Sequence, residues 1–247
     1  MDKNNLLINL KDISFLYADG GPVLNGLNLQ LHEGEKIGLV GPNGSGKTTL
    51  FHIIMGLLKP SSGTIEIFGR RACEEKDFNP IRQKIGLLFQ DADDQLFSPT
   101  VLEDVAFGPL NQGLPVHDAR SIAMETLSSL GLEGFENRIT YKLSGGEKKL
   151  VSLATVLAMK PRILLLDEPT TGLDADTTQK IIDVLSSIQI SYIFISHNMD
   201  FISSTTDKVW GLVDGRILFE KEKIPHTHVH SHGYGGLPHT HEDGEEH

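Results

Sequence analysis

The sequence has little of what stabilises secreted or membrane-spanning proteins. It contains one cysteine, Cys73, so no disulfide can form within the chain, which favours a reducing compartment. No apolar run approaches the ~18 residues needed to cross a bilayer. Residues 1–5 lack the apolar core of a signal peptide. We therefore expect any work at a membrane to go through a partner protein.

Positive charge is also scarce. Twenty-two lysines and arginines stand against 33 aspartates and glutamates, giving a net charge of −11. A sequence-independent grip on nucleic acid needs a basic face, so this balance counts against a nucleic-acid partner, although a local basic patch is not excluded. At 247 residues the chain can bury a sizeable core in one large domain or in two lobes.

A glycine-rich stretch at 41–48 has the form G-x-x-x-x-G-K-[ST]. It lies between the apolar run 37–40, a predicted buried strand, and a predicted helix that starts at Thr49 and stops near Pro60. A strand, a glycine-rich turn and a helix form the context of a phosphate-binding loop. Glycines let backbone N–H groups surround phosphate oxygens, and the helix start adds unpaired donors. The predicted nucleotide-binding residues are Gly41, Pro42, Asn43, Gly44, Ser45, Gly46, Lys47, Thr48 and Thr49.

Two carboxylates follow the buried strand predicted at 162–166. The carboxyl end of a strand in an open α/β sheet is where ligands bind. We expect Lys47 to reach the β- and γ-phosphates and the Thr48 hydroxyl to hold Mg²⁺. Asp167 is predicted to act on Mg²⁺, directly or through water, and Glu168 to polarise the attacking water. The alternative, an exposed strand end with a helix cap, is disfavoured by the phosphate loop upstream.

The order of the predicted elements indicates an α/β phosphate-loop NTPase core with two additions. Strands at 6–17 and 27–31 are expected to form an N-terminal antiparallel β layer. Residues 91–160 hold helical patterns but no convincing strand, so we expect a helical lobe inserted into the core. Strands of a mostly parallel sheet are predicted at 37–40, 85–89, 162–166 and 192–195.

A second glycine pair lies within Leu143-Ser144-Gly145-Gly146-Glu147, ahead of a predicted helix. Ser144 and Glu147 have the spacing of a capping box, which is a structural reason for both residues. It does not explain Gly145 and Gly146, because glycine in a first helical turn costs stability. The pair makes sense if the backbone must approach a phosphate closely.

Single residues near these motifs have two interpretations. On spacing alone, Tyr17 could equally stack on an adenine ring or pack on the sheet. His197 lies just past a predicted strand, where it is either structural or in contact with the γ-phosphate and the water. Asp174 is predicted to cap a helix, and Gln90 ends the strand at 85–89.

In this order and spacing the motifs resemble the nucleotide-binding subunit of ATP-binding-cassette (ABC) transporters, over about residues 6–221. The Ser-Gly-Gly stretch is the most specific piece. The resemblance implies that two subunits pair head to tail around two ATP molecules. Each γ-phosphate would then meet Lys47 of one chain and Ser144, Gly145 and Gly146 of the other. The other implied roles are adenine stacking by Tyr17, Mg²⁺ and water sensing by Gln90, an interface crossing by Asp174, γ-phosphate and water positioning by His197, and base catalysis by Glu168.

Two positions depart from the family pattern. Glu147 stands where glutamine is usual, which puts a carboxylate near the partner's nucleotide unless the side chain turns back to cap its own helix. Leu150 stands where a basic residue is common. A narrower similarity at 89–97 is to the ATPases of energy-coupling-factor importers, which bring in vitamins or cobalt and nickel ions. Ala92 replaces the usual proline there, which predicts a less rigid loop.

From Pro225 onward the composition changes. Seven of the eleven histidines lie here among glycines and acidic residues, with no lysine or arginine. Such a run cannot build a core, but it can fold around Ni²⁺, Co²⁺, Zn²⁺ or Cu²⁺. The alternative is a solvated tail that binds metal only in the test tube. The candidate ligands are His226, His228, His230, His232, His239 and His241.

Together these observations predict an ABC ATP-binding domain at 1–224 and a histidine-rich tail at 225–247. We expect an ATPase subunit bound peripherally at the cytoplasmic face of the cell membrane, with ATP and Mg²⁺ as cofactors. Its expected partners are integral membrane transport subunits and a second ATPase subunit, identical or not, and no nucleic acid. The predicted cargo is cobalt or nickel. The alternatives are a vitamin importer with an incidental tail and a soluble ABC ATPase acting on DNA or ribosomes.

Overall fold

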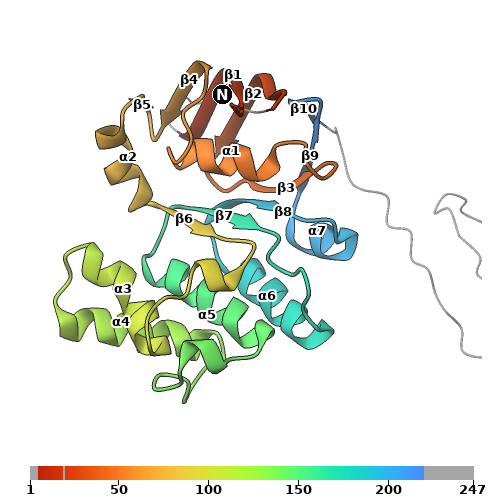
Figure 1. Cartoon of the computed structure of the whole chain (residues 1–247). Coiled ribbons are helices and arrows are strands. Elements are labelled where there is room, and N and C mark those ends of the chain that lie inside the picture. The colour runs from red at the N-terminus through yellow and green to blue at the C-terminus, as the bar shows by residue number, and fades with distance from the viewer. Residues whose placement is uncertain (1–4, 19, 220–247) are drawn as a thin grey trace, which may run out of the picture.

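The computed structural model describes residues 5–18 and 20–219, which form two sheets and the helices around them (Figure 1). The larger sheet has the strand order β10-β9-β3-β8-β7-β6. Every neighbouring pair in it is parallel except β9 and β10. This confirms the predicted mostly parallel sheet. Its strands are β3 (Lys36–Val40), β6 (Ile85–Leu88), β7 (Ile163–Asp167), β8 (Ser191–Ile195), β9 (Lys208–Val213) and β10 (Arg216–Phe219).

The second sheet is antiparallel, in the order β2-β1-β4-β5, and confirms the predicted N-terminal layer. Its first two strands pair along most of their length, and the second begins at Pro22 rather than at Leu27 as predicted. Helix α1 (Lys47–Ile54) lies between the two sheets, and one apolar core joins all three (Figure 1). The strands are β1 (Leu6–Leu16), β2 (Pro22–His32), β4 (Ser62–Ile67) and β5 (Arg70–Ala72).

Helix α1 ends earlier than the sequence indicated. Its last residue is Ile54, and Gly56 then adopts a φ of +67°. A Cβ on Gly56 would lie 2.3 Å from the ring of Phe78, which belongs to the short helix α2 (Glu75–Arg82). Only glycine fits this turn without strain, because its φ is positive and the ring leaves no room. The prediction of a helix continuing to the neighbourhood of Pro60 was therefore wrong.

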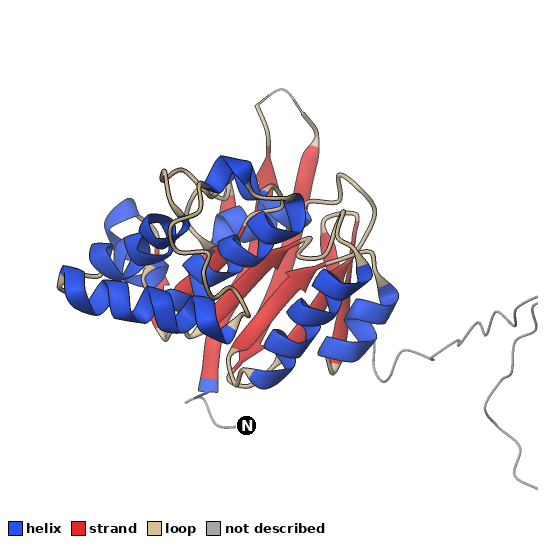
Figure 2. Ribbon diagram, turned by 90° about the horizontal axis from the view of Figure 1, so that it is seen from below, coloured by secondary structure: helices blue, strands red, loops and turns tan. Residues whose placement is uncertain are grey.

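The region 91–160 is helical, as expected. It is described throughout and contains no strand, and its β-type pairing is one isolated bridge between Thr100 and Ile139. The predicted capping box of Ser144 and Glu147 is present at the start of α5, and Thr100 and Glu103 form another at the start of α3. These helices pack around a second apolar core and gather to one side of the strands (Figure 2). The elements are the 3₁₀ turn Ala92–Asp94, α3 (Val101–Asn111), α4 (Val116–Ser129), the 3₁₀ turn Thr140–Lys142 and α5 (Gly145–Ala158).

Two further helices, α6 (Ala175–Ser187) and α7 (Met199–Thr205), contribute side chains to the second core. In the portions of the chain that the structure describes, 5–18 and 20–219, no helix has the length and apolar character to cross a membrane. The predicted domain boundary at 224 and the histidine-rich segment 225–247 lie outside the described residues. Both stay predictions.

Candidate functional site

The glycine-rich loop joins the end of β3 to the start of α1. Gly44 and Gly46 have φ values of +79° and +99°, which other residue types rarely adopt. A Cβ on Gly41 would lie 2.4 Å from the carbonyl oxygen of Leu212, so the loop starts directly against the backbone of β9. A larger residue at Gly41 would push the loop off this support.

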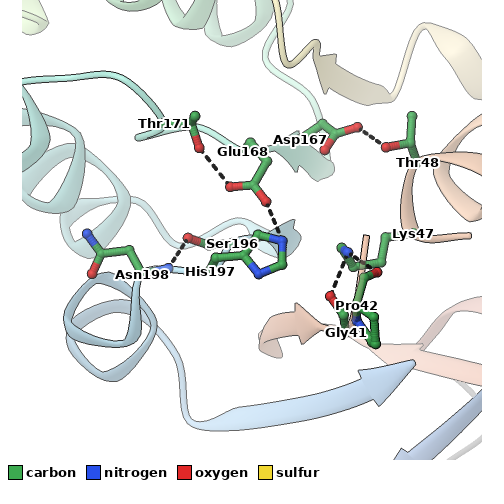
Figure 3. Close-up of polar contacts among 10 residues, drawn as sticks. All are labelled: Gly41, Pro42, Lys47, Thr48, Asp167, Glu168, Thr171, Ser196, His197 and Asn198. Carbon is green, nitrogen blue, oxygen red and sulfur yellow. Dashed lines mark hydrogen bonds and ion pairs between the residues drawn. The ribbon is translucent and has the colours of Figure 1, made fainter. Parts of the chain in front are cut away.

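Lys47 is the first residue of α1 and is 7% exposed. Its ammonium donates hydrogen bonds to the carbonyl oxygens of Gly41 at 2.8 Å and Pro42 at 3.0 Å (Figure 3). Burial lowers the pKa of Lys47, and the charges of Glu168 and Asp167 oppose that shift. Since both acceptors are neutral carbonyls, the charge of this lysine is left to attract an anion.

Thr48 and Asp167 meet across the loop, the Thr48 hydroxyl donating to Oδ2 of Asp167 at 2.7 Å (Figure 3). Asp167 is 4% exposed, and its Oδ1 is buried without a hydrogen-bond partner, as is the hydroxyl of Ser45. Burial raises the pKa of Asp167, and the Thr48 hydrogen bond opposes the rise. A hydroxyl beside a carboxylate with an unpaired oxygen is a donor set that suits Mg²⁺.

Glu168 directly follows β7 and has a φ of +47°, a conformation that costs energy for a side chain of this size. Its backbone N–H donates to the carbonyl of Ile195 at 3.0 Å. Its carboxylate, on a residue 8% exposed, accepts from the Thr171 hydroxyl at 2.9 Å and lies 3.4 Å from Nε2 of His197 (Figure 3). The structure thus brings Glu168 and His197 together, although the sequence presents them in separate motifs.

Tyr17 keeps both of its predicted interpretations. The residue is 45% exposed, and its hydroxyl lies 3.1 Å from the hydroxyl of Thr49 in the first turn of α1. Its ring meets Phe15 edge-on, with 4.9 Å between ring centroids. The ring therefore packs against Phe15 and its hydroxyl contacts the start of α1, so adenine stacking stays a prediction.

Residues 144–146 and Asp174 stand apart from this cluster and are exposed or half-buried. Asp174 caps the start of α6, accepting a 2.8 Å hydrogen bond from the N–H of Thr177. Within 5–18 and 20–219, no hydrogen bond joins residues 144–146 or Asp174 to the loop at 41–49. One chain therefore assembles only part of the predicted site.

Glu147 turns back toward its own helix, which was one of the two expectations for it. Its Oε2 accepts from the Ser144 N–H at 2.8 Å, and the Ser144 hydroxyl accepts from the Glu147 N–H at 3.3 Å. Oε1 accepts from Arg138 at 2.9 Å, and that guanidinium lies 3.6 Å from the ring centroid of Phe135. The Ser144 hydrogen bond lowers the pKa of Glu147, and Arg138 adds to the effect. Sequence reasoning did not single out Arg138.

Gln90 is exposed, and the segment around it is tied to α5. Lys149, 3% exposed, donates to the carbonyl of Gln90 at 2.7 Å and to that of Phe89 at 3.0 Å. Burial lowers the pKa of Lys149 to about 8. The Gln95 side chain accepts from the Phe89 N–H at 3.1 Å and donates to the carbonyl of Ser152 at 2.8 Å. Sequence reasoning missed Lys149 and Gln95 as residues of the site.

Comparison with known proteins decides the family. The sequence pattern of the ABC transporter family matches residues 24–171. The chain belongs to this family. It is an ATP-binding ATPase whose hydrolysis is coupled to transport, as the motifs predicted. A similar curated protein is the energy-coupling factor transporter ATP-binding protein EcfA of Methanothermobacter thermautotrophicus, 47% identical over 218 residues, which are 87% of this chain and 70% of that protein.

Solved structures of ABC proteins share the fold. The structure of cbiO1 from Clostridium perfringens, part of the ABC transporter complex cbiONQ, is 35% identical with a TM-score of 0.77, covering 87% of this chain and 88% of its own. A dimeric ATP-binding cassette in a post-hydrolysis state, bound to ADP and Pi, is 29% identical with a TM-score of 0.80, covering 87% and 98%. These likenesses confirm the predicted α/β phosphate-loop fold.

Proposed function

We propose that this chain is the ATPase subunit of an energy-coupling-factor importer, that it works as a head-to-tail pair clamping two ATP molecules, and that its cargo is cobalt or nickel. The observation that carries the proposal is a division within one chain. Lys47, Thr48, Asp167, Glu168 and His197 are gathered around the glycine-rich loop. Among the described residues, no hydrogen bond joins the exposed or half-buried stretch at 144–146 to that loop.

ATP and Mg²⁺ fit the gathered residues. Lys47 binds the β- and γ-phosphates, while the Thr48 hydroxyl and the unpaired Oδ1 of Asp167 hold Mg²⁺. Mg²⁺ supplies neutralisation of the phosphate charge. Glu168 serves as the base that takes a proton from water, because the Thr171 hydroxyl fixes one of its oxygens and leaves the other facing His197.

The remaining predicted roles complete the pair. Tyr17 stacks on the adenine, and Gln90 senses Mg²⁺ and water near the membrane partner. Asp174 and residues 144–146 of one chain meet the nucleotide held by the other. Their exposure supports this role, as does the dimeric cassette with ADP and Pi among similar structures. ATP shifts the population toward the closed pair, and hydrolysis releases it.

The proposal includes integral membrane subunits and a position at the cytoplasmic face, and the names of similar proteins support a transporter that works as part of a complex. One is an energy-coupling-factor ATPase, and another belongs to a complex named cbiONQ. The histidine composition of 225–247 favours a transition metal over a vitamin. Affinity order alone favours copper and zinc, so the tail does not name the ion.

Uptake measurements test the proposal. Cells producing wild-type protein or Glu168→Gln are given labelled cobalt, nickel and, in parallel, vitamins, and the ATPase is purified from membranes with its bound subunits. We expect uptake of cobalt or nickel to fail in the variant and small integral membrane proteins to co-purify. Loss of vitamin uptake with normal metal uptake would replace the proposed cargo. Recovery with ribosomes or DNA, and no transport defect, would reject an importer.

A further inference from the structure

We infer that Arg138 neutralises Glu147 so that the start of α5 can receive the triphosphate held by a second chain. Arg138 is a positioning residue in this sense, because it acts on the nucleotide site through Glu147. The inference rests on the proposed ATP-clamped pair. It adds that the surface at 144–146, which would cover the partner's nucleotide, carries a neutralised carboxylate.

Glu147 presents an electrostatic problem for such a pair. It lies in the first turn of α5, one residue after the stretch 144–146 that would cover the partner's triphosphate. An acidic residue here favours the helix, since the amino end of a helix carries partial positive charge. The same negative charge opposes a polyphosphate that approaches the same backbone N–H groups.

The structure occupies both oxygens of this carboxylate. Oε2 accepts from the Ser144 N–H at 2.8 Å, and Oε1 accepts from Arg138 at 2.9 Å. The side chains of Glu147 and Arg138 are 32% and 49% exposed, so the pair lies at the surface beside residues 144–146. A nucleotide arriving from another chain would therefore meet a neutral pair instead of a bare carboxylate.

Arg138 is held in place without help from Glu147. Its guanidinium stacks on Phe135, its own N–H donates to the Phe135 carbonyl at 2.8 Å, and its carbonyl accepts from the Val101 N–H at 3.1 Å. An exposed ion pair usually contributes little stabilisation, because fixing two long side chains in one geometry costs conformational entropy. Stacking reduces that cost here because the arginine is already oriented.

A double-mutant cycle tests the inference in full-length Glu168→Gln protein, which is expected to keep ATP without turning it over. The measured quantity is the ATP concentration that gives half-maximal pairing by sedimentation. We expect Arg138→Met to raise it about tenfold, Glu147→Gln to change it by about twofold or less, and the double variant to return to within about twofold of Glu147→Gln. The Arg138→Met defect should shrink between about 50 mM and about 500 mM salt, since salt screens repulsion.

Arg162→Met is a matched control. Arg162 is 50% exposed, pairs with Glu33 at 3.7 Å and stacks on Phe68, with 4.9 Å to the ring centroid. It precedes the amino end of β7, whereas Asp167 is at the carboxyl end of that strand. Losing this arginine costs a similar ion pair and a similar stack, and we expect no change in the ATP concentration needed for pairing.

Three results would overturn the inference. The first is normal ATP-dependent pairing by Arg138→Met, and the second is a pairing defect that does not change with salt. The third is a double variant that needs as much ATP for pairing as Arg138→Met, which would mean that the arginine only shapes the segment around 135–139. Arg138→Lys, which keeps charge and loses the planar stack, should show a smaller defect than Arg138→Met if misfolding is not the cause. If the Glu168→Gln parent itself does not pair with ATP, the proposed function fails first, and the cycle is lost with it.

Discussion

The two glycine-bearing helix starts of this chain are built in opposite ways. At α1 the N-cap is Gly46, no side chain caps the helix, and no acidic residue lies in the first turn. At α5 Ser144 and Glu147 form a complete capping box, and Arg138 closes it from outside. The start of α1 therefore leaves its donors for a ligand, whereas at the start of α5 the N–H groups of Ser144 and Glu147 are already bonded within the capping box.

The start of α1 is therefore a binding site that a ligand would complete, whereas the start of α5 is a surface that a second chain would contact. Around α1 the buried Lys47, the unpaired Oδ1 of Asp167 and the left-handed Glu168 all carry a cost that a bound nucleotide and metal would relieve. Around α5, residues 144–147 have neither a buried side-chain atom without a hydrogen-bond partner nor a positive φ. The comparison predicts that lesions at α1 act on binding and chemistry, and lesions at α5 act on pairing.

The largest expected effect is at Lys47. Lys47→Met should weaken ATP binding about 100-fold or more, because the substitution removes the buried positive charge that we expect to contact the phosphates. Titration of the purified protein with a fluorescent ATP analogue measures the loss. Lys36→Met, at the amino end of the same β3 strand, should bind normally. Wild-type ATP affinity in Lys47→Met would reject the start of α1 as the phosphate-binding site.

Glu168→Gln should retain ATP binding, lower steady-state hydrolysis by about 10²- to 10⁴-fold, and trap a dimer, since the amide cannot accept the proton of the water. Phosphate release and sedimentation with ATP measure the two outcomes. Asp200→Asn, an exposed carboxylate in the first turn of α7, serves as the control. Normal turnover in Glu168→Gln would reject Glu168 as the base.

Mixing two defective chains sharpens the comparison directly. Lys47→Met damages a chain's own loop, and Ser144→Arg damages only the surface lent to a partner. Each should be inactive as a pair of identical chains. A one-to-one mixture should recover about a quarter of wild-type hydrolysis, because half of the pairs are mixed and each mixed pair has one intact site. No recovery, or activity in Ser144→Arg alone, would show that the two helix starts do not serve one shared site.

The smallest effect expected is on stability. Burial raises the pKa of Asp167, so the folded chain binds this proton more readily than the unfolded chain. Stability from the protonated form is present below the ordinary carboxyl pKa and is lost as pH rises through the raised value. Asp167→Asn should therefore raise the free energy of unfolding of nucleotide-free protein by about 1 kcal/mol at neutral pH. The gain, measured by urea titration, should fade toward pH ~4, and equal stability at both pH values would contradict it.

Short-range patterns predicted much of this molecule. The capping box at Ser144 depends on two residues three positions apart, and the glycine-rich turn at 41–48 lies between a strand and a helix that follow each other directly in the sequence. Helices α2 and α7 were not predicted. Helix α2 contains Pro80, which is unusual inside a helix, and α7 has only seven residues, too few to show a clear helical pattern.

The site was predicted where a residue's place along the chain fixes its place in space. Asp167 and Glu168 follow a buried strand, and the loop at 41–48 carries its own signature. The ties of Lys149 to Phe89 and of Gln95 to Ser152 join residues about 60 positions apart. No local pattern contains them, because tertiary packing alone decides which carbonyl a buried ammonium meets.

The support of Gly41 by Leu212 has a consequence for how the protein is made. The glycine-rich turn leaves the ribosome when β9 has not yet been synthesised, and it lies flush on the β9 backbone only in the finished sheet. Gly215, at the tip of the β9–β10 hairpin, in turn fits against the backbone of β2 near Asn25. In a growing chain this backbone support of the glycine-rich turn therefore exists only after β9 has been synthesised.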